Sequence, residues 1–272
     1  MIPNTIERFV DRRGRTIGLG LMWVVIALLW IPIGIVTLMS FAADRALAFP
    51  PDELTLHWYR EFLQNDAAID AVFTSLQVSV IATLITVVLA TILSYAIAKY
   101  EFPGKGMIQL VVTLPIIVPL VVVGVAMVLF FGVINVGTGF WSVVIAHVVR
   151  TIPFAALIII PTMLRFDETL EEAAKDLGAD ELDVFVNVRL PNILPGIVAG
   201  GLLAFTISFN EFVYTYFVRD TRTETLPIYL WNQIRFEASP EVNVISVVFL
   251  LVAIGMILLA LAITNVQRIT MR

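Results

Sequence analysis

The sequence of 272 residues contains no cysteine and only two histidines. The absence of cysteine excludes disulfides, thiolate metal ligands and thiol catalysis. The two histidines, His57 and His147, are too few for a histidine-based metal site. Basic residues are also outnumbered, because the net charge is −5 and the isoelectric point is about 5.1. That balance argues against a nucleic-acid partner, which a basic patch would attract.

The sequence also lacks the motifs that common ATPases and membrane enzymes need. It contains no Gly-x-x-x-x-Gly-Lys-Ser/Thr phosphate loop, so we expect no ATP hydrolysis by this chain alone. It has no Gly-x-Ser-x-Gly motif, no histidine cluster and no pair of carboxylates within an apolar stretch. We therefore predict a non-catalytic protein with no cofactor of its own.

Charged residues are few, and apolar residues are abundant. The chain is 14% charged and 59% hydrophobic, with a mean hydropathy of +0.94. Soluble domains are about 45–50% apolar and about 25% charged. A soluble core of this size cannot hide the excess, so membrane lipid must be part of the solvent.

Six stretches have the length of about 20 apolar residues that a helix needs to cross the hydrocarbon core. They cover residues 17–41, 71–98, 106–132, 140–163, 194–218 and 242–266. The first begins after a basic tail, as a secretory signal would. Its apolar run is longer than the roughly 7–15 residues of a signal core, so we expect a retained helix.

The distribution of basic residues predicts the orientation of these helices. Lysine and arginine are more frequent in the N-terminal tail, in the second and fourth joints and in the C-terminal tail than in the other joints. Because cytoplasmic segments carry such an excess, both termini are predicted to be cytoplasmic. The predicted fold is an all-α membrane protein with six transmembrane helices in one domain, residues 1–272. Within the third span, Pro115 and Pro119 lie one turn apart and predict a bend.

The joint at residues 164–193 is the longest on the predicted cytoplasmic side, and it is patterned. One helical stripe is apolar, and the opposite face is charged. The stripe consists of Leu170, Ala173, Ala174 and Leu177, and the charged face of Glu171, Glu172, Lys175 and Asp176. Thr169 has the spacing of a capping box, and Glu171 precedes Lys175 by four residues, which predicts an ion pair.

Gly178 is placed to end this first short helix, and Asp180 is placed to cap a second one. Leu182, Phe185 and Val186 supply the apolar residues of the second helix, and Leu190-Pro191 is expected to close it. The two amphipathic helices either fold back on the protein and membrane surface or dock onto a cytoplasmic partner.

The same joint resembles a known family. Glu172-Ala173-Ala174, Gly178 and Val188-Arg189-Leu190-Pro191 match the signature of binding-protein-dependent ABC importer permeases in type and spacing, with valine in place of isoleucine at residue 188. The resemblance implies that residues 164–193 form a coupling loop, with Glu172, Ala173, Ala174, Gly178, Leu190 and Pro191 as its signature positions. It also implies that ATP and Mg²⁺ bind to separate ATPase subunits.

The resemblance extends over nearly the whole chain and is similar to the spermidine/putrescine-type branch, in particular its C-like subunit. The segments that carry it are residues 147–154, 170–179, 208–212, 225–228 and 239–243. It implies these partners: a second permease subunit, two ATPase subunits and an external or periplasmic solute-binding protein. It further implies a multi-pass location in a bacterial inner membrane. Two residues depart from that branch, because Asn210 precedes Glu211 and Arg150 stands where an uncharged residue is expected.

Arg150 and Glu211 are ionisable residues inside predicted spans, where charge is costly and points to function. At 1.5 Å per residue, Glu211 lies about 10 Å and Arg150 about 15 Å from the outer boundary. They can therefore form a structural ion pair, or they can line the transport path. In the second case Glu211 would hold an ammonium group and Arg150 a carboxylate or phosphonate, while Asn210, Tyr214 and Tyr216 add polar or cation–π contacts.

Three functions compete for this pattern. The first is an importer permease for a small organic solute, with a polyamine ahead of an amino-acid-like zwitterion. The second is a stand-alone secondary transporter, which often shows inverted repeats; no clear repeat is visible, and the patterned loop would have no role. The third is a membrane enzyme, for which the usual motifs are missing. The sequence favours the first.

Overall fold

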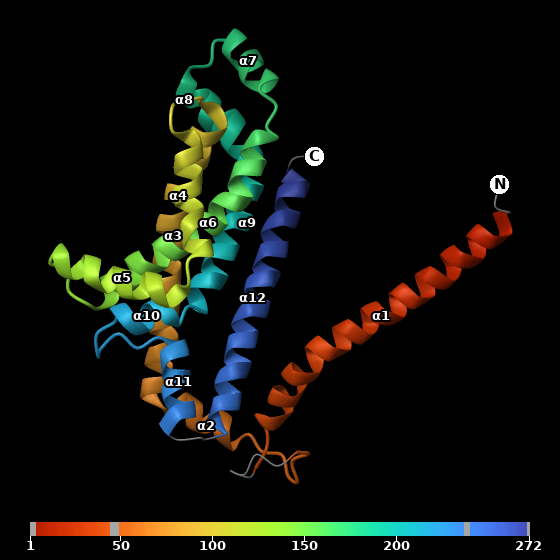
Figure 1. The fold of residues 1–272 in the computed structure, drawn as a ribbon, viewed down its shortest axis with the longest axis vertical. Coiled ribbons are helices and arrows are strands. Elements are labelled where there is room, and N and C mark those ends of the chain that lie inside the picture. Colours follow the sequence, from red (N-terminus) through yellow and green to blue (C-terminus); the bar gives the residue numbers. More distant parts are fainter. Residues whose placement is uncertain (1–3, 44–48, 237–239, 271–272) are drawn as a thin grey trace. The chain divides into compact units, whose positions relative to one another are not determined.

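The computed structural model describes residues 4–43, 49–236 and 240–270, and nearly all of them are helical (Figure 1). In these ranges the only β-contact is an isolated bridge between Ala42 and Leu54. The elements are α1 (Asn4–Met39), α2 (His57–Gln64), α3 (Asp66–Lys99), α4 (Lys105–Ile117), α5 (Leu120–Val133), α6 (Phe140–Leu164), α7 (Thr169–Asp176), α8 (Glu181–Val184), the π-helical turn η1 (Phe185–Arg189), α9 (Leu190–Phe209), α10 (Val213–Val218), α11 (Leu226–Phe236) and α12 (Glu241–Thr270). The predicted all-α class is confirmed.

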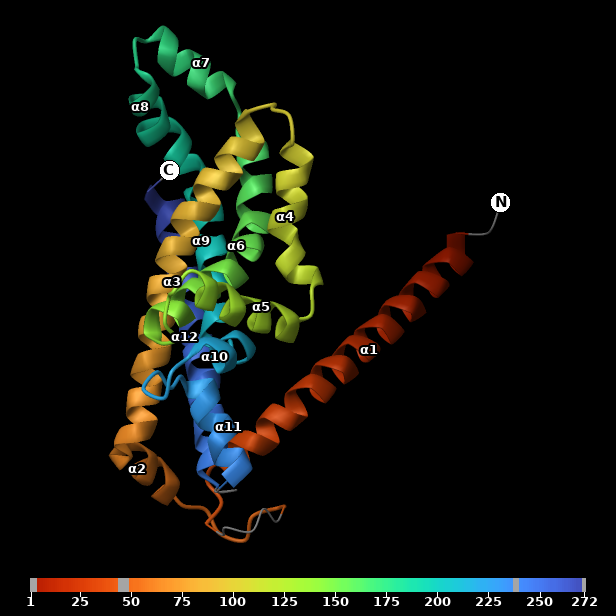
Figure 2. The same ribbon diagram turned by 60° about the vertical axis from the view of Figure 1, so that its left-hand side comes forward.

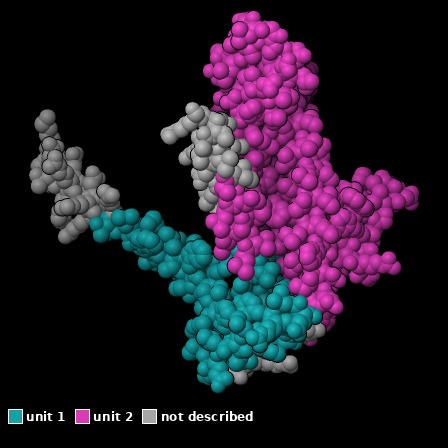
Figure 3. All heavy atoms as spheres, turned by 180° about the vertical axis from the view of Figure 1, so that it is seen from behind, with its two compact units in different colours: residues 1–64, 237–250 teal, residues 65–236, 251–272 magenta. Residues whose placement is uncertain are grey.

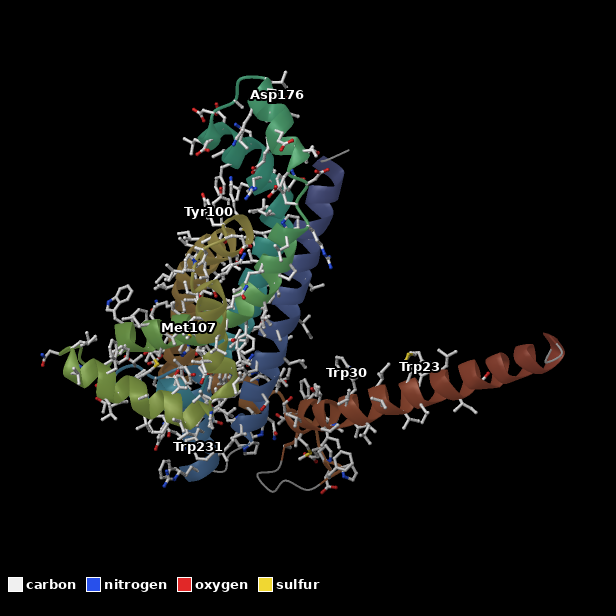
Figure 4. The ribbon with its side chains drawn as sticks, turned by 45° about the horizontal axis from the view of Figure 1, so that its top comes forward. Trp23, Trp30, Tyr100, Met107, Asp176 and Trp231 are labelled. Carbon is white, nitrogen blue, oxygen red and sulfur yellow. The ribbon has the colours of Figure 1, made fainter. Side chains whose placement is uncertain are left out.

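The chain divides into two compact units, which Figure 3 colours separately. One unit contains residues 1–64 and 237–250, and the other contains residues 65–236 and 251–272. In the first unit, the Trp58 indole donates to the Ala42 carbonyl at 2.8 Å. Trp23 and Trp30 project from α1 and are exposed in this single chain (Figure 4). The prediction of one domain over residues 1–272 is not tested by this division.

The core of the second unit is a bundle of α3, α6 and α9, which lie side by side (Figures 1 and 2). Small residues allow the close approach of these helices. A Cβ atom on Gly200 would lie 3.2 Å from the Ala155 carbonyl of α6, and one on Gly201 would lie 2.9 Å from Val87 of α3. Glycine therefore lets the backbone of α9 pack tightly against both neighbours.

The bend predicted in the third span is confirmed, and it is sharp. Helices α4 and α5 meet at an angle of 111° across Val118 and Pro119 (Figure 2). Pro119 has no N–H group with which to continue the helix. The pair is therefore either one broken span or a re-entrant segment, rather than a gently kinked helix.

The fifth span was predicted as one continuous stretch, and that prediction is wrong. α9 ends at Phe209, and α10 begins only at Val213, so residues 210–212 form a break. At its other end, the expected stop at Leu190-Pro191 is also wrong, because η1 leads directly into α9. Pro191 cannot donate a backbone hydrogen bond, and a wide π turn immediately before it accommodates that loss.

Among the described residues, four helices are long and apolar enough to cross a membrane, or up to five if the bent pair counts as one span. They are residues 16–39, 66–99, 140–164 and 181–209. The part of α12 from Glu241 to Met256 is a shorter apolar helix. The six-span count and the cytoplasmic termini therefore stay predictions.

Candidate functional site

The two intramembrane charges lie together in the second unit. Arg150 Nε on α6 is 3.4 Å from Glu211 Oε2. The Arg150 side chain is 16% exposed and that of Glu211 is 6% exposed. The sequence left open whether these residues pair or line a path, and the structure pairs them. The guanidinium carbon also lies 5.0 Å from the Phe154 ring centre and 5.9 Å from that of Tyr214, which favours the cation.

Glu211 occupies the break between α9 and α10. Its Oε1 accepts a hydrogen bond from the Tyr214 backbone N–H at 3.0 Å, while its Oε2 faces Arg150. Thr215 Oγ1 donates to the Glu211 carbonyl at 3.1 Å. The carboxylate therefore has two roles. It caps the backbone where α10 begins, and it neutralises Arg150.

His147 joins the same break to α6. Its Nδ1 lies 2.8 Å from Ser208 Oγ at the end of α9, and its Nε2 lies 2.8 Å from Thr215 Oγ1 in α10. The ring is almost fully buried. His147 is therefore a hydrogen-bonded residue of α6 that links it to both sides of the break. Among the described residues, no group of three metal-ligating side chains is brought together.

The other proposed solute contacts surround this break without converging on one point. Tyr214 is fully buried, whereas Tyr216 is 47% exposed. Asn210 is exposed and donates to the Thr206 carbonyl at 2.8 Å. The sequence analysis missed an aromatic group here: the Phe212 ring is 5.6 Å from Tyr216 and 5.5 Å from Trp231 of α11. Trp231 is far along the chain from the break, so local spacing could not have found it.

The coupling loop has the predicted helix–turn–helix form. Gly178 lies between α7 and α8 with φ of +90°, which confirms that this position uses the freedom of glycine. Asp180 caps the second helix by accepting from the Asp183 N–H at 2.8 Å. The capping box at Thr169 is wrong. Before the first helix, Asp167 accepts hydrogen bonds from the backbone N–H and the hydroxyl of Thr169, which hold the pKa of the Asp167 carboxyl below its usual value.

Glu171 was placed on the solvated face of the loop, paired with Lys175, and that prediction is wrong. Glu171 is buried and accepts a hydrogen bond from Arg189 Nε, and Lys99 Nζ lies 3.6 Å away. Lys175 instead lies 3.9 Å from Glu181. Because the chain turns back at Gly178, η1 comes alongside α7 and brings Arg189 to Glu171.

The apolar face of the loop is open in the single chain. Leu177 is 91% exposed and Leu182 is 70% exposed. Asp176 lies near the end of this projecting segment (Figure 4). Of the signature positions, Glu172 and Ala173 are also exposed. The loop's own bundle therefore leaves these apolar side chains uncovered.

Long apolar helices, interrupted helices and a buried intramembrane ion pair are typical of membrane transport proteins. The family described as "Binding-protein-dependent transport system inner membrane component" matches residues 88–271, and the chain belongs to this family. It is a family of ABC transporter permeases, which are non-catalytic membrane subunits.

Two relatives illustrate the similarity. The chain is 31% identical to the spermidine/putrescine transport system permease protein PotC of Haemophilus influenzae, over 90% of this chain and 95% of the relative. It is 30% identical to the putrescine transport system permease protein PotI of Escherichia coli, over 82% of this chain and 81% of the relative. The resemblance to the spermidine/putrescine-type branch is thereby confirmed.

Solved structures share the fold at lower identity. A chain of a bacterial ABC transporter that imports the acidic polysaccharide alginate aligns with a TM-score of 0.72 and 14% identity, over 97% of this chain and 99% of that chain. A chain of the MetNI methionine ABC transporter aligns with a TM-score of 0.59 and 15% identity, over 73% and 95%. These solutes are chemically unlike, so the fold does not select the solute.

Proposed function

We propose that this chain is the transmembrane permease subunit of an ABC importer that moves a polyamine or related small amine inward. The observation that carries the importer function is the exposed coupling loop at residues 164–193, in a chain of the permease family. The two relatives named for spermidine and putrescine support the amine. The proposal includes six spans with both termini cytoplasmic, in a bacterial inner membrane.

The proposed assembly contains a second permease subunit, two ATPase subunits that bind ATP and Mg²⁺, and a periplasmic solute-binding protein. Ala173, Ala174 and Gly178 would lie in the interface with one ATPase subunit, and Leu190-Pro191 would join that interface to α9. The exposed apolar residues of the loop support this role, because a large exposed apolar patch on a cytoplasmic segment requires a partner.

Glu211 is the proposed contact for an ammonium group, with Asn210, Tyr214 and Tyr216 beside it. A carboxylate in a low-dielectric site attracts a cation strongly. Its present partner is Arg150, so an ammonium group would have to replace that guanidinium. If Arg150 keeps Glu211 throughout, solute specificity rests on the binding protein and on the second permease.

An amino-acid-like or phosphonate zwitterion is the second candidate. The observation that favours it is Arg150, a cation that remains 16% exposed beside the Glu211 carboxylate. A zwitterion could satisfy both charges, whereas a polycation would be repelled by Arg150.

The test is uptake by the full complex reconstituted in vesicles, with spermidine, putrescine and a zwitterionic amino acid as separate substrates. We expect uptake of an amine that requires ATP and the binding protein. Glu211→Gln should reduce that uptake while leaving assembly and basal ATP hydrolysis intact, and unchanged uptake would remove Glu211 from the solute site. Uptake of the zwitterion alone would select the second candidate. Uptake by the chain without ATPase subunits would reject an ABC importer.

A further inference from the structure

Two helix breaks lie next to α6, and one side chain of α6 reaches both. The first is the 111° break between α4 and α5, and the second is the interruption between α9 and α10. Arg150 of α6 contacts Glu211 in the second break at 3.4 Å. Its Nη1 also donates to the Pro115 carbonyl in the last turn of α4, at 3.4 Å.

The Pro115 carbonyl is available because of the residue that causes the bend. In an unbroken α-helix it would accept from the N–H of residue 119, and Pro119 has none. The carbonyl groups at a helix C-terminus also carry partial negative charge, which favours a cation. Arg150 therefore satisfies a backbone group that the break in α4–α5 leaves without its helical donor.

Glu211 has the matching role in the other break, because it caps the Tyr214 N–H where α10 begins. The guanidinium is a planar fork with separate N–H groups, so Nη1 can donate to the Pro115 carbonyl while Nε faces Glu211, whereas a lysine ammonium has one nitrogen for both. The Nε atom of Arg150 makes no hydrogen bond among the described residues, so its contact with Glu211 is an ion pair and not an aligned hydrogen bond.

We propose that Arg150 is a positioning residue that clamps the α4–α5 break and the α9–α10 break together, so that the two change geometry as one unit. The clamp concerns the permease itself and does not depend on which solute is carried. It predicts that removing the Glu211 carboxylate alters the α4–α5 angle, although Glu211 belongs to neither helix.

The absence of cysteine makes a direct test possible, because two introduced cysteines will be the only labelling sites in this chain. Met107 of α4 and Leu129 of α5 are both well exposed and lie on opposite sides of the bend. With the partner subunits also free of reactive cysteine, spin labels at Met107→Cys and Leu129→Cys report the α4–α5 angle in the assembled complex. The wild-type background should give a narrow distribution of label distances.

Arg150→Gln and Glu211→Gln should each broaden this distribution and shift it toward longer distances. Because α5 also packs on α10, Glu211→Gln could act without Arg150. The double variant distinguishes the two routes. If the clamp acts through Arg150, adding Glu211→Gln to Arg150→Gln causes no further change in the label distances. Arg165→Gln, which removes an exposed cation after the same helix, is the matched control and should change nothing.

If Arg150→Gln does not assemble, a milder variant carries the test. Arg150→Lys keeps the charge but loses the fork, and it should give an intermediate distribution. Pro119→Ala restores the backbone N–H and removes the cause of the bend, so it supplies the reference distance for a straightened α4–α5 segment. A wild-type distribution in Arg150→Gln, or in Arg150→Lys where Arg150→Gln does not assemble, overturns the clamp, as does additivity of the Arg150 and Glu211 changes.

Discussion

Within the described residues, two arginine–glutamate pairs lie inside the second unit and are built from similar parts. Arg150 lies between the rings of Phe154 and Tyr214 and faces Glu211. Arg189 lies 4.9 Å from the Tyr95 ring centre and 5.0 Å from that of Phe166, and it donates directly to Glu171. In each case two aromatic rings shield a cation whose counter-ion comes from another element.

The two pairs differ in their hydrogen bonding and in the elements that they join. Arg189–Glu171 is hydrogen-bonded, has Lys99 as a second cation and closes the coupling loop onto the end of α3. Arg150–Glu211 is an unaligned ion pair, and it joins two interrupted helices inside the bundle. This difference is what the proposed coupling role requires: a tightly held loop at the ATPase interface and a looser contact between the interrupted helices.

The largest effect is expected from breaking the tighter pair. Glu171→Ala leaves the buried Arg189 without its hydrogen-bonded partner, and removing one member of a buried pair costs about 3–5 kcal/mol. The loop at residues 166–189 should lose protection from amide hydrogen exchange in the membrane-embedded complex. The matched control is Glu181→Ala, which removes an exposed carboxylate from the same loop. Equal protection in both variants would show that Glu171 does not fix the loop.

A smaller effect is expected for the intramembrane pair. Polar side-chain contacts within membranes contribute about 0.6 kcal/mol on average and at most about 1.7 kcal/mol. A double-mutant cycle with Arg150→Met and Glu211→Met, followed by SDS-induced unfolding, should give a coupling energy in that range. A coupling above that of Arg189 and Glu171, measured in the same way, would reverse the comparison.

A similar or smaller effect is expected at the turn of the coupling loop. Gly178 has φ of +90°, and nothing lies within 4 Å of a Cβ atom built there, so only backbone strain opposes a side chain. Left-handed backbone costs a non-glycine residue about 1–2 kcal/mol, and asparagine tolerates it best. Gly178→Val should therefore lower solute-stimulated ATP hydrolysis more than Gly178→Asn. An equal loss of stimulated hydrolysis in both variants would indicate that any side chain lacks space at this position, rather than that the backbone is strained.

The smallest effect is expected at the exposed pair of Lys175 and Glu181. Such pairs contribute about 0–1 kcal/mol. Glu181→Gln should leave thermal stability and solute-stimulated ATP hydrolysis close to wild type. A marked loss of hydrolysis with normal stability would place Glu181 in the partner interface and not in a solvated pair.

The sequence predicts the features that have a single local cause. Pro119 removes a backbone donor, so the bend could be placed; Gly178 and Asp180 have local roles in a turn and a cap. The break at residues 210–212 contains neither proline nor glycine, and it depends on His147 and Arg150 from another helix. Glu171 has the periodicity of a solvated residue, and only the return of η1 alongside α7 buries it.

The same limit applies to the candidate site. Charge and depth indicated that Arg150 and Glu211 could meet, because two costly charges in neighbouring spans favour pairing. Their spacing along the chain contains no information on the Pro115 carbonyl, which is a backbone group of a third element. The contribution of Trp231 to the aromatic group likewise follows from tertiary packing alone.

We propose that the exposed loop couples ATP hydrolysis by a separate subunit to transport through this permease. The most direct test is ATP hydrolysis by the reconstituted complex, with and without solute-loaded binding protein, in Glu172→Lys and in the control Glu168→Lys. Both glutamates are exposed and lie one turn apart in the same loop. We predict that Glu172→Lys assembles in the membrane but loses stimulated hydrolysis and uptake, whereas Glu168→Lys retains more of both. Normal stimulation and uptake in Glu172→Lys would contradict the claim.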